Sequence, residues 1–274
     1  AVPLKNEIMK NSVITANPTL TTSSNNTTDA SGLYKSTATN TGDATYYFRG
    51  NVENNYVSFA GHTWRIVRIN EDGTIRIVMQ DGINNNTSYA FNYNYDNYTY
   101  MYYTNNSNAK TQLESWYQTN IGSKSDSTKN VASGNYYCEQ AKVKYSDSDT
   151  SGSATMTTYN KYTPDFKCSS DGNGKGVVNA SVGLLTYDEV VYAGGYYGQN
   201  NNNYYLYNNT NFWTMSPRGF TNPYSCVWLG FMTGEIYANY VHYDTSYLRP
   251  VLILNADTLV TGTGTSSDPF VINS

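Results

Sequence analysis

The stretch from Thr45 to Asp81 constrains the fold more than any other part of the chain. Trp64-Arg65-Ile66-Val67-Arg68-Ile69 leads into the turn Asn70-Glu71-Asp72-Gly73, and Thr74-Ile75-Arg76-Ile77-Val78-Met79 leads out of it. Two β-branched runs on either side of an Asp-Gly pair are the strongest local signal for a β-hairpin. The alternating arginines predict that one face of this hairpin is solvated or lies against acidic partners.

The rest of the chain mixes strands with short helices. Residues 4–10 and 109–121 have helical character, and Thr186-Tyr187-Asp188-Glu189 has the form of a capping box that begins a helix. Gly194-Gly195 should end that helix. Apolar runs at 212–217, 227–229 and 248–254 predict further strands. The fold class is therefore α+β, strand-rich with two or more short helices, and the polar stretch 122–183 is a long insertion.

Solubility comes from neutral polar groups, because only 14% of the residues are charged while 29 are tyrosine. High aromatic content with low charge argues against disorder. The net charge is -4 and no basic run stands out, which excludes the usual nucleic-acid binder. The chain has no stretch of 18 or more apolar residues, so we expect no segment to span a membrane. The chain opens with Ala1-Val2-Pro3, so we expect a signal or anchor to have preceded it.

Three cysteines are present, and the polar stretch between Cys138 and Cys168 has little apolar content of its own. A disulfide closing that loop would stabilise it by roughly 3–4 kcal/mol and would require an oxidising compartment. Two free buried thiols are the alternative. No cysteine–histidine cluster exists, so we expect no metal and no cofactor.

Catalytic residues are not indicated. Of the two histidines, His62 precedes a core-like strand and His242 lies among tyrosines, where it could contact a ligand. The paired acids Asp188 and Glu189 are explained by the first turn of a helix. No phosphate-binding glycine loop is present.

Residues 218–247 combine five tyrosines with small polar residues and lack both lysine and glutamine. Tyrosine offers rigid, amphipathic contact area with few torsions to freeze, as in antibody paratopes. The alternative is a tyrosine-rich surface that merely follows the composition of the chain. Two further Tyr/Asn-rich loops, 92–108 and 196–210, could flank such a site or be solvated; the sequence leaves this open.

The order of several motifs resembles the variable proteins of diversity-generating retroelements. FWTMSP at 212–217, VWL at 227–229 and LRPV at 248–251 resemble their C-terminal half, and the segment from Tyr46 to Val78 resembles a bacterial surface subgroup. With LLTYDEVVYAGG and the tail ADTLVTGTGTSSDPF, the likeness covers most of residues 30–272.

The resemblance implies a C-type-lectin-like fold, close to the formylglycine-generating-enzyme branch, over residues 31–274, after an N-terminal arm at 1–30 and with a variable region at 212–254. It also implies that a reverse transcriptase randomises selected codons. The randomised codons can encode Tyr, Asn, Ser or Cys but not Lys, Glu, Met or Trp. Cys226 could be such a product, whereas Met232 and Glu235 should be scaffold. The expected ligand-facing positions are Asn222, Tyr224, Ser225, Gly230, Phe231, Thr233, Tyr237, Asn239, His242, Tyr243, Asp244 and Ser246. The expected rigid scaffold beneath them is Trp213, Trp228, Arg249 and Pro250.

The calcium–sugar motifs of true lectins and the paired catalytic cysteines of formylglycine-generating enzymes have no match here. The sequence thus predicts a non-enzymatic, hypervariable receptor or adhesin on a bacterial surface, with a membrane or pilus anchor. Its ligand would be a protein or a glycan. The ligand would bind a common surface that contains tyrosines 224, 237 and 243. The alternatives are an invariant structural or pilin-like subunit and a carbohydrate-binding or formylglycine-type enzyme.

Overall fold

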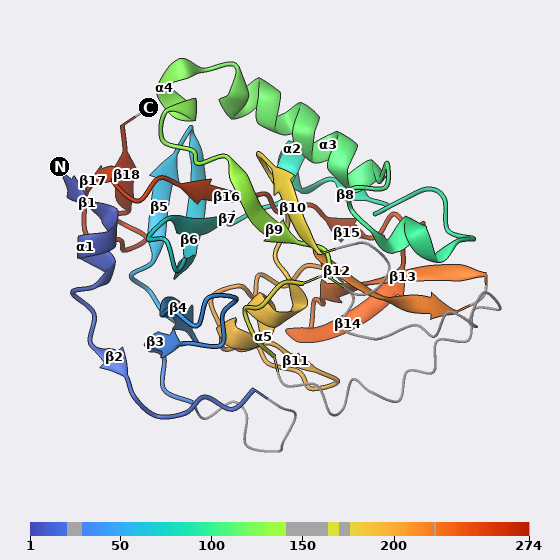
Figure 1. Ribbon diagram of the computed structural model, residues 1–274, viewed down its shortest axis with the longest axis horizontal. Coiled ribbons are helices and arrows are strands. Elements are labelled where there is room, and N and C mark those ends of the chain that lie inside the picture. Colours follow the sequence, from blue (N-terminus) through green and yellow to red (C-terminus); the bar gives the residue numbers. More distant parts are fainter. Residues whose placement is uncertain (21–28, 141–163, 170–175, 222, 274) are drawn as a thin grey trace.

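The structure, a computed structural model, describes residues 1–20, 29–140, 164–169, 176–221 and 223–273. Within these ranges the strands form sheets of ten, six and two strands, and short helices lie around and between them (Figure 1). The expectation of a strand-rich α+β fold is confirmed.

The ten-stranded sheet contains both chain ends and the predicted hairpin. Strand β6 is its longest member: β5 and β4 pair with successive parts of one edge, and β7 pairs with the other edge and carries β16 beyond it. The strands are β1 (Val2–Pro3), β17 (Leu259–Thr261), β18 (Phe270–Ile272), β5 (Tyr56–Phe59), β6 (His62–Ile69), β4 (Thr45–Arg49), β3 (Gly32–Ser36), β2 (Val13–Ile14), β7 (Ile75–Met79) and β16 (Val251–Leu254).

The β6–β7 hairpin forms as predicted. The Asn70 amide donates to the Thr74 carbonyl at 2.8 Å, and the Gly73 amide donates to the Asn70 carbonyl at 2.9 Å. Gly73 has φ 86°, a left-handed conformation that glycine adopts without a Cβ clash. Every residue of β7 is buried, so the hairpin lies in the core rather than at the surface.

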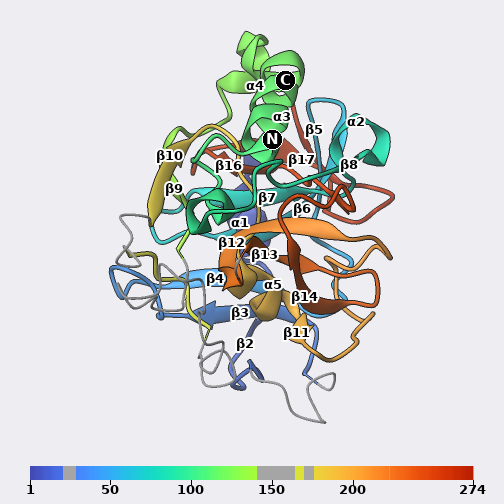
Figure 2. The ribbon, with the colours of Figure 1, turned by 90° about the vertical axis from the view of Figure 1, so that its right-hand side faces the viewer.

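The six-stranded sheet is built around two long antiparallel neighbours, β12 and β13, with β14 beside β13 (Figure 2). Pro217 lies where the register of β12 shifts, which is how a sheet accommodates a residue without an amide donor. In order, the strands are β11 (Tyr196–Tyr197), β14 (Glu235–Tyr240), β13 (Tyr224–Gly230), β12 (Phe212–Thr221), β15 (Ser246–Tyr247) and β8 (Ser88–Tyr89).

Helix α5 (Tyr187–Ala193) joins the two large sheets. All seven residues are buried, and it contacts β4 on one side and β12, β13 and β14 on the other. The predicted capping box is confirmed, since Thr186 accepts from the Glu189 amide and the Glu189 carboxylate accepts from the Thr186 amide. Gly194, at φ 128°, follows the helix.

The remaining helical segments lie outside this junction. In Figure 1, α3 and α4 run along the top of the molecule. The segments are α1 (Leu4–Ile8), α2 (Ile83–Asn86), the 3₁₀ turn η2 (Tyr98–Met101), α3 (Asn108–Tyr117), the π turn η3 (Gln118–Gly122) and α4 (Ser125–Thr128). None of the helices in the described ranges is long and apolar enough to cross a membrane.

The polar stretch 122–183 contains α4 and a small hairpin, β9 (Gly134–Cys138) with β10 (Val177–Ala180); residues 141–163 and 170–175 lie outside the described residues. The predicted disulfide is present between Cys138 and Cys168, with Cα atoms 5.9 Å apart. Cys226 is free and buried. Burial raises the pKa of its thiol to about 11, so the thiol is neutral at physiological pH.

Candidate functional site

Five aromatic side chains meet at the end of the β13–β14 hairpin farthest from its turn. This aromatic cluster consists of Tyr95, Tyr224, Tyr240, His242 and Tyr243. The ring centroids of Tyr95 and His242 are 4.3 Å apart, and those of Tyr224 and Tyr240 are 4.6 Å apart. Tyr95 and Tyr243 are exposed at 37% and 43%, and the other three are half-buried. The cluster is therefore a packed aromatic surface with its outer rings in water.

Hydrogen bonds attach the loop that carries Tyr95 to the hairpin. The amide of Ser225 donates to the Tyr95 carbonyl at 2.8 Å, and the Ser225 hydroxyl donates to the Asn97 carbonyl at 2.5 Å. At the start of this loop, the Asn92 amide donates to the Val241 carbonyl at 2.9 Å. The Tyr/Asn-rich loop 92–108 thus joins the cluster, which the sequence had left open.

His242 lies at the centre of the cluster. Its ring contacts those of Tyr95, Tyr224, Tyr240 and Tyr243, the last in an edge-on arrangement at 4.6 Å. Burial lowers the pKa of His242, and within the described residues its Nδ1 has no hydrogen-bond partner. His242 therefore joins the four tyrosine rings of the cluster.

Three of the expected ligand-facing residues are buried, and the prediction is wrong for them. Ser225 is fully buried because it holds the 92–97 loop, and Ser246 is fully buried in β15 against β8. Gly230 packs under Phe212: a Cβ at this position would meet the Phe212 ring at 2.2 Å. These three positions belong to the scaffold.

The remaining expected residues divide between the two ends of the hairpin. Tyr224, His242 and Tyr243 lie in the aromatic cluster, with the exposed Asp244 next to them. Phe231, Thr233 and Tyr237 lie at the turn end, where the Phe231 and Tyr237 rings are 5.6 Å apart. Asn239 lies between the groups and donates to Thr245 at 3.3 Å; Asn222 lies outside the described residues.

The expected scaffold residues are all buried. Trp228 packs against Tyr187 of α5, and the Trp213 indole donates to the Tyr89 carbonyl at 2.7 Å. Arg249 donates to the carbonyls of Met79 and Leu206, while its neighbour Pro250 lies just before β16. Burial lowers the pKa of Arg249 to about 10.

The other two expected scaffold residues, Met232 and Glu235, are not buried. Met232 is 46% exposed in the hairpin turn, whereas Glu235 is half-buried. In the second Tyr/Asn-rich loop, 196–210, Tyr204 and Tyr205 are buried in the core. That loop supports the framework and contributes no ring to the aromatic cluster.

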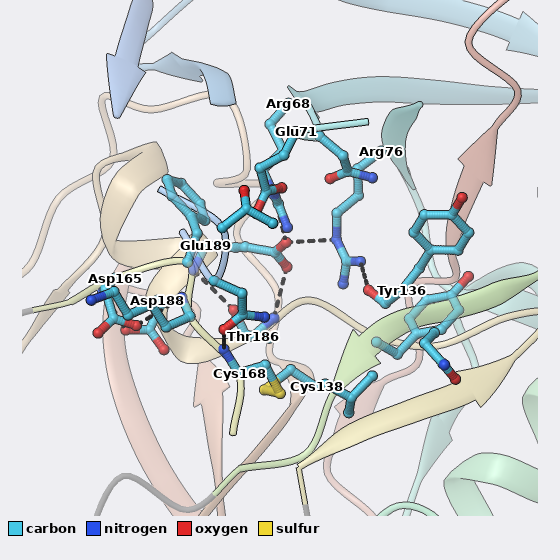
Figure 3. A pocket seen from close by; sticks show the side chains of 18 of the residues that line it. Arg68, Glu71, Arg76, Tyr136, Cys138, Asp165, Cys168, Thr186, Asp188 and Glu189 are labelled. Atoms are coloured by element: carbon cyan, nitrogen blue, oxygen red, sulfur yellow. Dashed lines mark hydrogen bonds and ion pairs between the residues drawn. A yellow bond between two sulfur atoms is a disulfide. The ribbon is translucent and has the colours of Figure 1, made fainter. Parts of the chain in front are cut away.

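A second candidate is a charged cavity of about 250 Å³ between β6, β7, the start of α5 and the disulfide (Figure 3). At its centre the Glu189 carboxylate lies 2.6 Å from Arg76 Nε and 3.4 Å from Arg68 Nε. Arg76 also donates to the Tyr136 carbonyl, and Arg68 pairs with Glu71 at 3.3 Å. Arg68 and Arg76 thus lie against acidic partners, one of the two predicted arrangements, whereas the buried Arg65 donates to Asn55 and to the Val52 carbonyl.

These charged groups hold the structure together. The ion pairs join α5 to the β6–β7 hairpin, and the Asp165 amide donates to the Asp188 carboxylate at 3.1 Å. The lining residues include no histidine and no free thiol, and the Thr186 hydroxyl already caps α5. The central charges pair with one another, so we assign this cavity a structural role.

Sequence reasoning missed Tyr95 and Tyr240 as members of the cluster. The density of tyrosine in 92–108 was the available signal, but only the pairing of this loop with β13 brings Tyr95 to the hairpin. Across the described ranges, no group of three or more His, Cys, Asp and Glu side chains could hold a metal ion. Comparison with protein-family models, curated proteins and solved structures returned no match.

Proposed function

We propose that this protein is a non-enzymatic recognition protein that binds its ligand through the aromatic cluster. The observation that carries the proposal is the contact among five rings from two distant segments, with two of the rings exposed on the outside. Such rings lose little conformational entropy on binding because their neighbours already hold them. The exposed tyrosines and the half-buried histidine also suit a protein ligand, since each offers apolar area and a polar atom.

We propose further that the scaffold is C-type-lectin-like and that a retroelement diversifies the positions in and beside the cluster. The order of the sequence motifs supports this, as do the residue types at Tyr224, His242 and Tyr243. The buried Trp213 and Trp228 would form the constant framework. In this proposal the protein is displayed on a bacterial surface, where the Cys138–Cys168 disulfide would be stable.

Sequencing the locus across a clonal population tests the retroelement proposal. We expect substitutions at 224, 242 and 243, with 213, 228 and 230 unchanged, and a near-copy of the coding repeat beside a reverse-transcriptase gene. An unvarying locus would instead favour an invariant structural or pilin-like subunit.

Adhesion measurements test the recognition proposal. Beads coated with the protein are passed over a panel of bacterial and animal cell surfaces, and retention is compared for the parent and the Tyr224→Ser, Tyr243→Ser double variant. Since truncation of an interface tyrosine costs about 1–2 kcal/mol or more, we expect at least a tenfold loss of retention. Leu259→Ser is the matched control: Leu259 is 51% exposed on β17, in the other sheet. Equal retention of the double variant and the parent would refute the role of the cluster.

A further inference from the structure

A second cavity, of about 500 Å³, lies between the start of β6, the loop after β7 and the end of α3. It shares no residue with the aromatic cluster. Its lining is mostly neutral and polar, with four amide side chains, one carboxylate and one imidazole. These six side chains are His62, Asp81, Asn84, Asn85, Asn86 and Asn120.

The loop places three of these amides by an unusual backbone conformation. The segment labelled α2 is a left-handed turn: Asn84 has φ 51° and ψ 50°, Asn85 has φ 57° and ψ 48°, and Asn86 has φ 60°. A left-handed conformation is unfavourable for every non-glycine residue, and asparagine tolerates it best. Consecutive left-handed residues of this kind persist only where their surroundings hold them, commonly at binding sites.

Local hydrogen bonds hold the turn. The Gly82 amide donates to Asn86 Oδ1 at 2.6 Å, and the Thr87 hydroxyl donates to the Asn84 carbonyl at 2.6 Å. Asn84 also donates its side-chain amide to the Tyr89 hydroxyl at 2.7 Å. Asn85 differs: within the described part of the chain its exposed side chain makes no hydrogen bond. Asn85 therefore lines the cavity without serving the turn itself.

Two aromatic residues belong to the lining, the half-buried His62 and the buried Trp116. The ring centroids of His62 and Trp116 are 5.2 Å apart, and Trp116 in turn packs on the buried Trp64 at 6.2 Å. His62 Nε2 lies 3.4 Å from Asn120 Oδ1, and Asn120 donates to the Trp116 carbonyl at 2.9 Å. Packing and hydrogen bonding thus fix His62, Trp116 and Asn120 in this part of the lining.

We infer that this cavity binds an uncharged saccharide. Primary amides offer both donors and acceptors, which match the paired donor and acceptor character of sugar hydroxyls. The carboxylate of Asp81 adds strong acceptors, and the half-buried His62 ring offers apolar contact for the C–H face of a pyranose. No lysine or arginine lines the cavity, so it lacks the charge that a phosphate or sulfate ligand requires.

Titration with free sugars tests the inference. Glucose, galactose, mannose and N-acetylglucosamine are each titrated into the intact protein and followed by tryptophan fluorescence and calorimetry, with inorganic phosphate as the anionic probe. We expect saturable binding of at least one sugar, unaffected by EDTA, and no binding of phosphate. Absence of binding by all four sugars, preferential binding of phosphate, or loss of sugar binding in EDTA would overturn the inference.

Asn85→Gly locates the site. Glycine keeps the left-handed backbone and removes only the amide, so the fold is preserved while sugar affinity falls by about tenfold or more. Asn106→Gly is the matched control, since Asn106 is an exposed asparagine at φ 52° outside the cavity. The inference fails if both variants lose affinity equally, or if affinity is lost only in the Tyr224→Ser, Tyr243→Ser variant.

Discussion

Single charged residues connect the two large sheets. Glu189 is 3% exposed, and its carboxylate faces the guanidinium groups of both Arg68 and Arg76. Burial lowers the pKa of Arg68, and the neighbouring Glu189 charge opposes that change. The same carboxylate closes the capping box of α5. One side chain therefore pairs with both Arg68 and Arg76 and begins the helix that contacts both sheets.

Glu189→Gln should destabilise the protein by about 3–5 kcal/mol, because it leaves the buried Arg76 guanidinium without its anion and removes one of the two anions beside Arg68. Urea denaturation followed by circular dichroism would measure the change. Glu114→Gln is the control: Glu114 pairs with Lys110 at 2.8 Å on the exposed face of α3, and its loss should cost no more than about 0.5 kcal/mol. Equal effects of the two substitutions would show that the buried network contributes little.

At the scale of elements, the disulfide attaches one short segment to another. Cys138 ends β9, and Cys168 follows Phe166, whose ring stacks on Tyr192 of α5 at 4.1 Å. The Phe166 amide also donates to the Ala38 carbonyl at 2.8 Å. The bridge therefore connects the β9–β10 hairpin to the segment that covers α5.

The double variant Cys138→Ser, Cys168→Ser should lose about 3–4 kcal/mol of stability, since the bridge closes a loop of 30 residues. Thermal and urea denaturation under non-reducing conditions would measure this. Cys226→Ala leaves the bridge intact and should cost only about 1 kcal/mol. Titration of the unfolded, non-reduced parent should find one thiol; a count of three would contradict the bridge.

At the scale of the whole molecule, the core contains many phenols. Burial raises the pKa of Tyr196 to about 12, and raises those of Tyr47, Tyr137, Tyr204 and Tyr205 still further above the ordinary value of 10.0. The folded state therefore keeps protons that the unfolded chain releases above pH 10. The stability contributed by these neutral phenols is complete below pH 10 and is lost as the pH rises beyond it.

The urea midpoint should therefore be steady between about pH 7 and 9 and fall steeply above about pH 10. Phenolate absorbance should rise in a cooperative step on unfolding, when the buried tyrosines reach solvent. Cys226 adds to the same trend, because its pKa is also raised. A midpoint unchanged up to about pH 11 would contradict the prediction.

Local patterns in the sequence determined several elements of this fold. The Asp-Gly turn between β-branched runs predicts β6–β7, and the Thr186–Glu189 box predicts the start of α5, because a few neighbouring residues decide each of these features. The disulfide follows from a polar stretch with too little apolar content of its own. In each case the physical cause lies within one segment.

Only the tertiary structure decided which side chains meet. Whether Ser225 faces solvent or the 92–97 loop depends on a partner more than a hundred residues away in sequence, and Gly230 is fixed by the Phe212 ring beside it. Tyr95 joins the cluster through hydrogen bonds between segments that the sequence does not relate. Burial is a property of contacts between distant segments, and no local pattern in this chain specifies which segments those are.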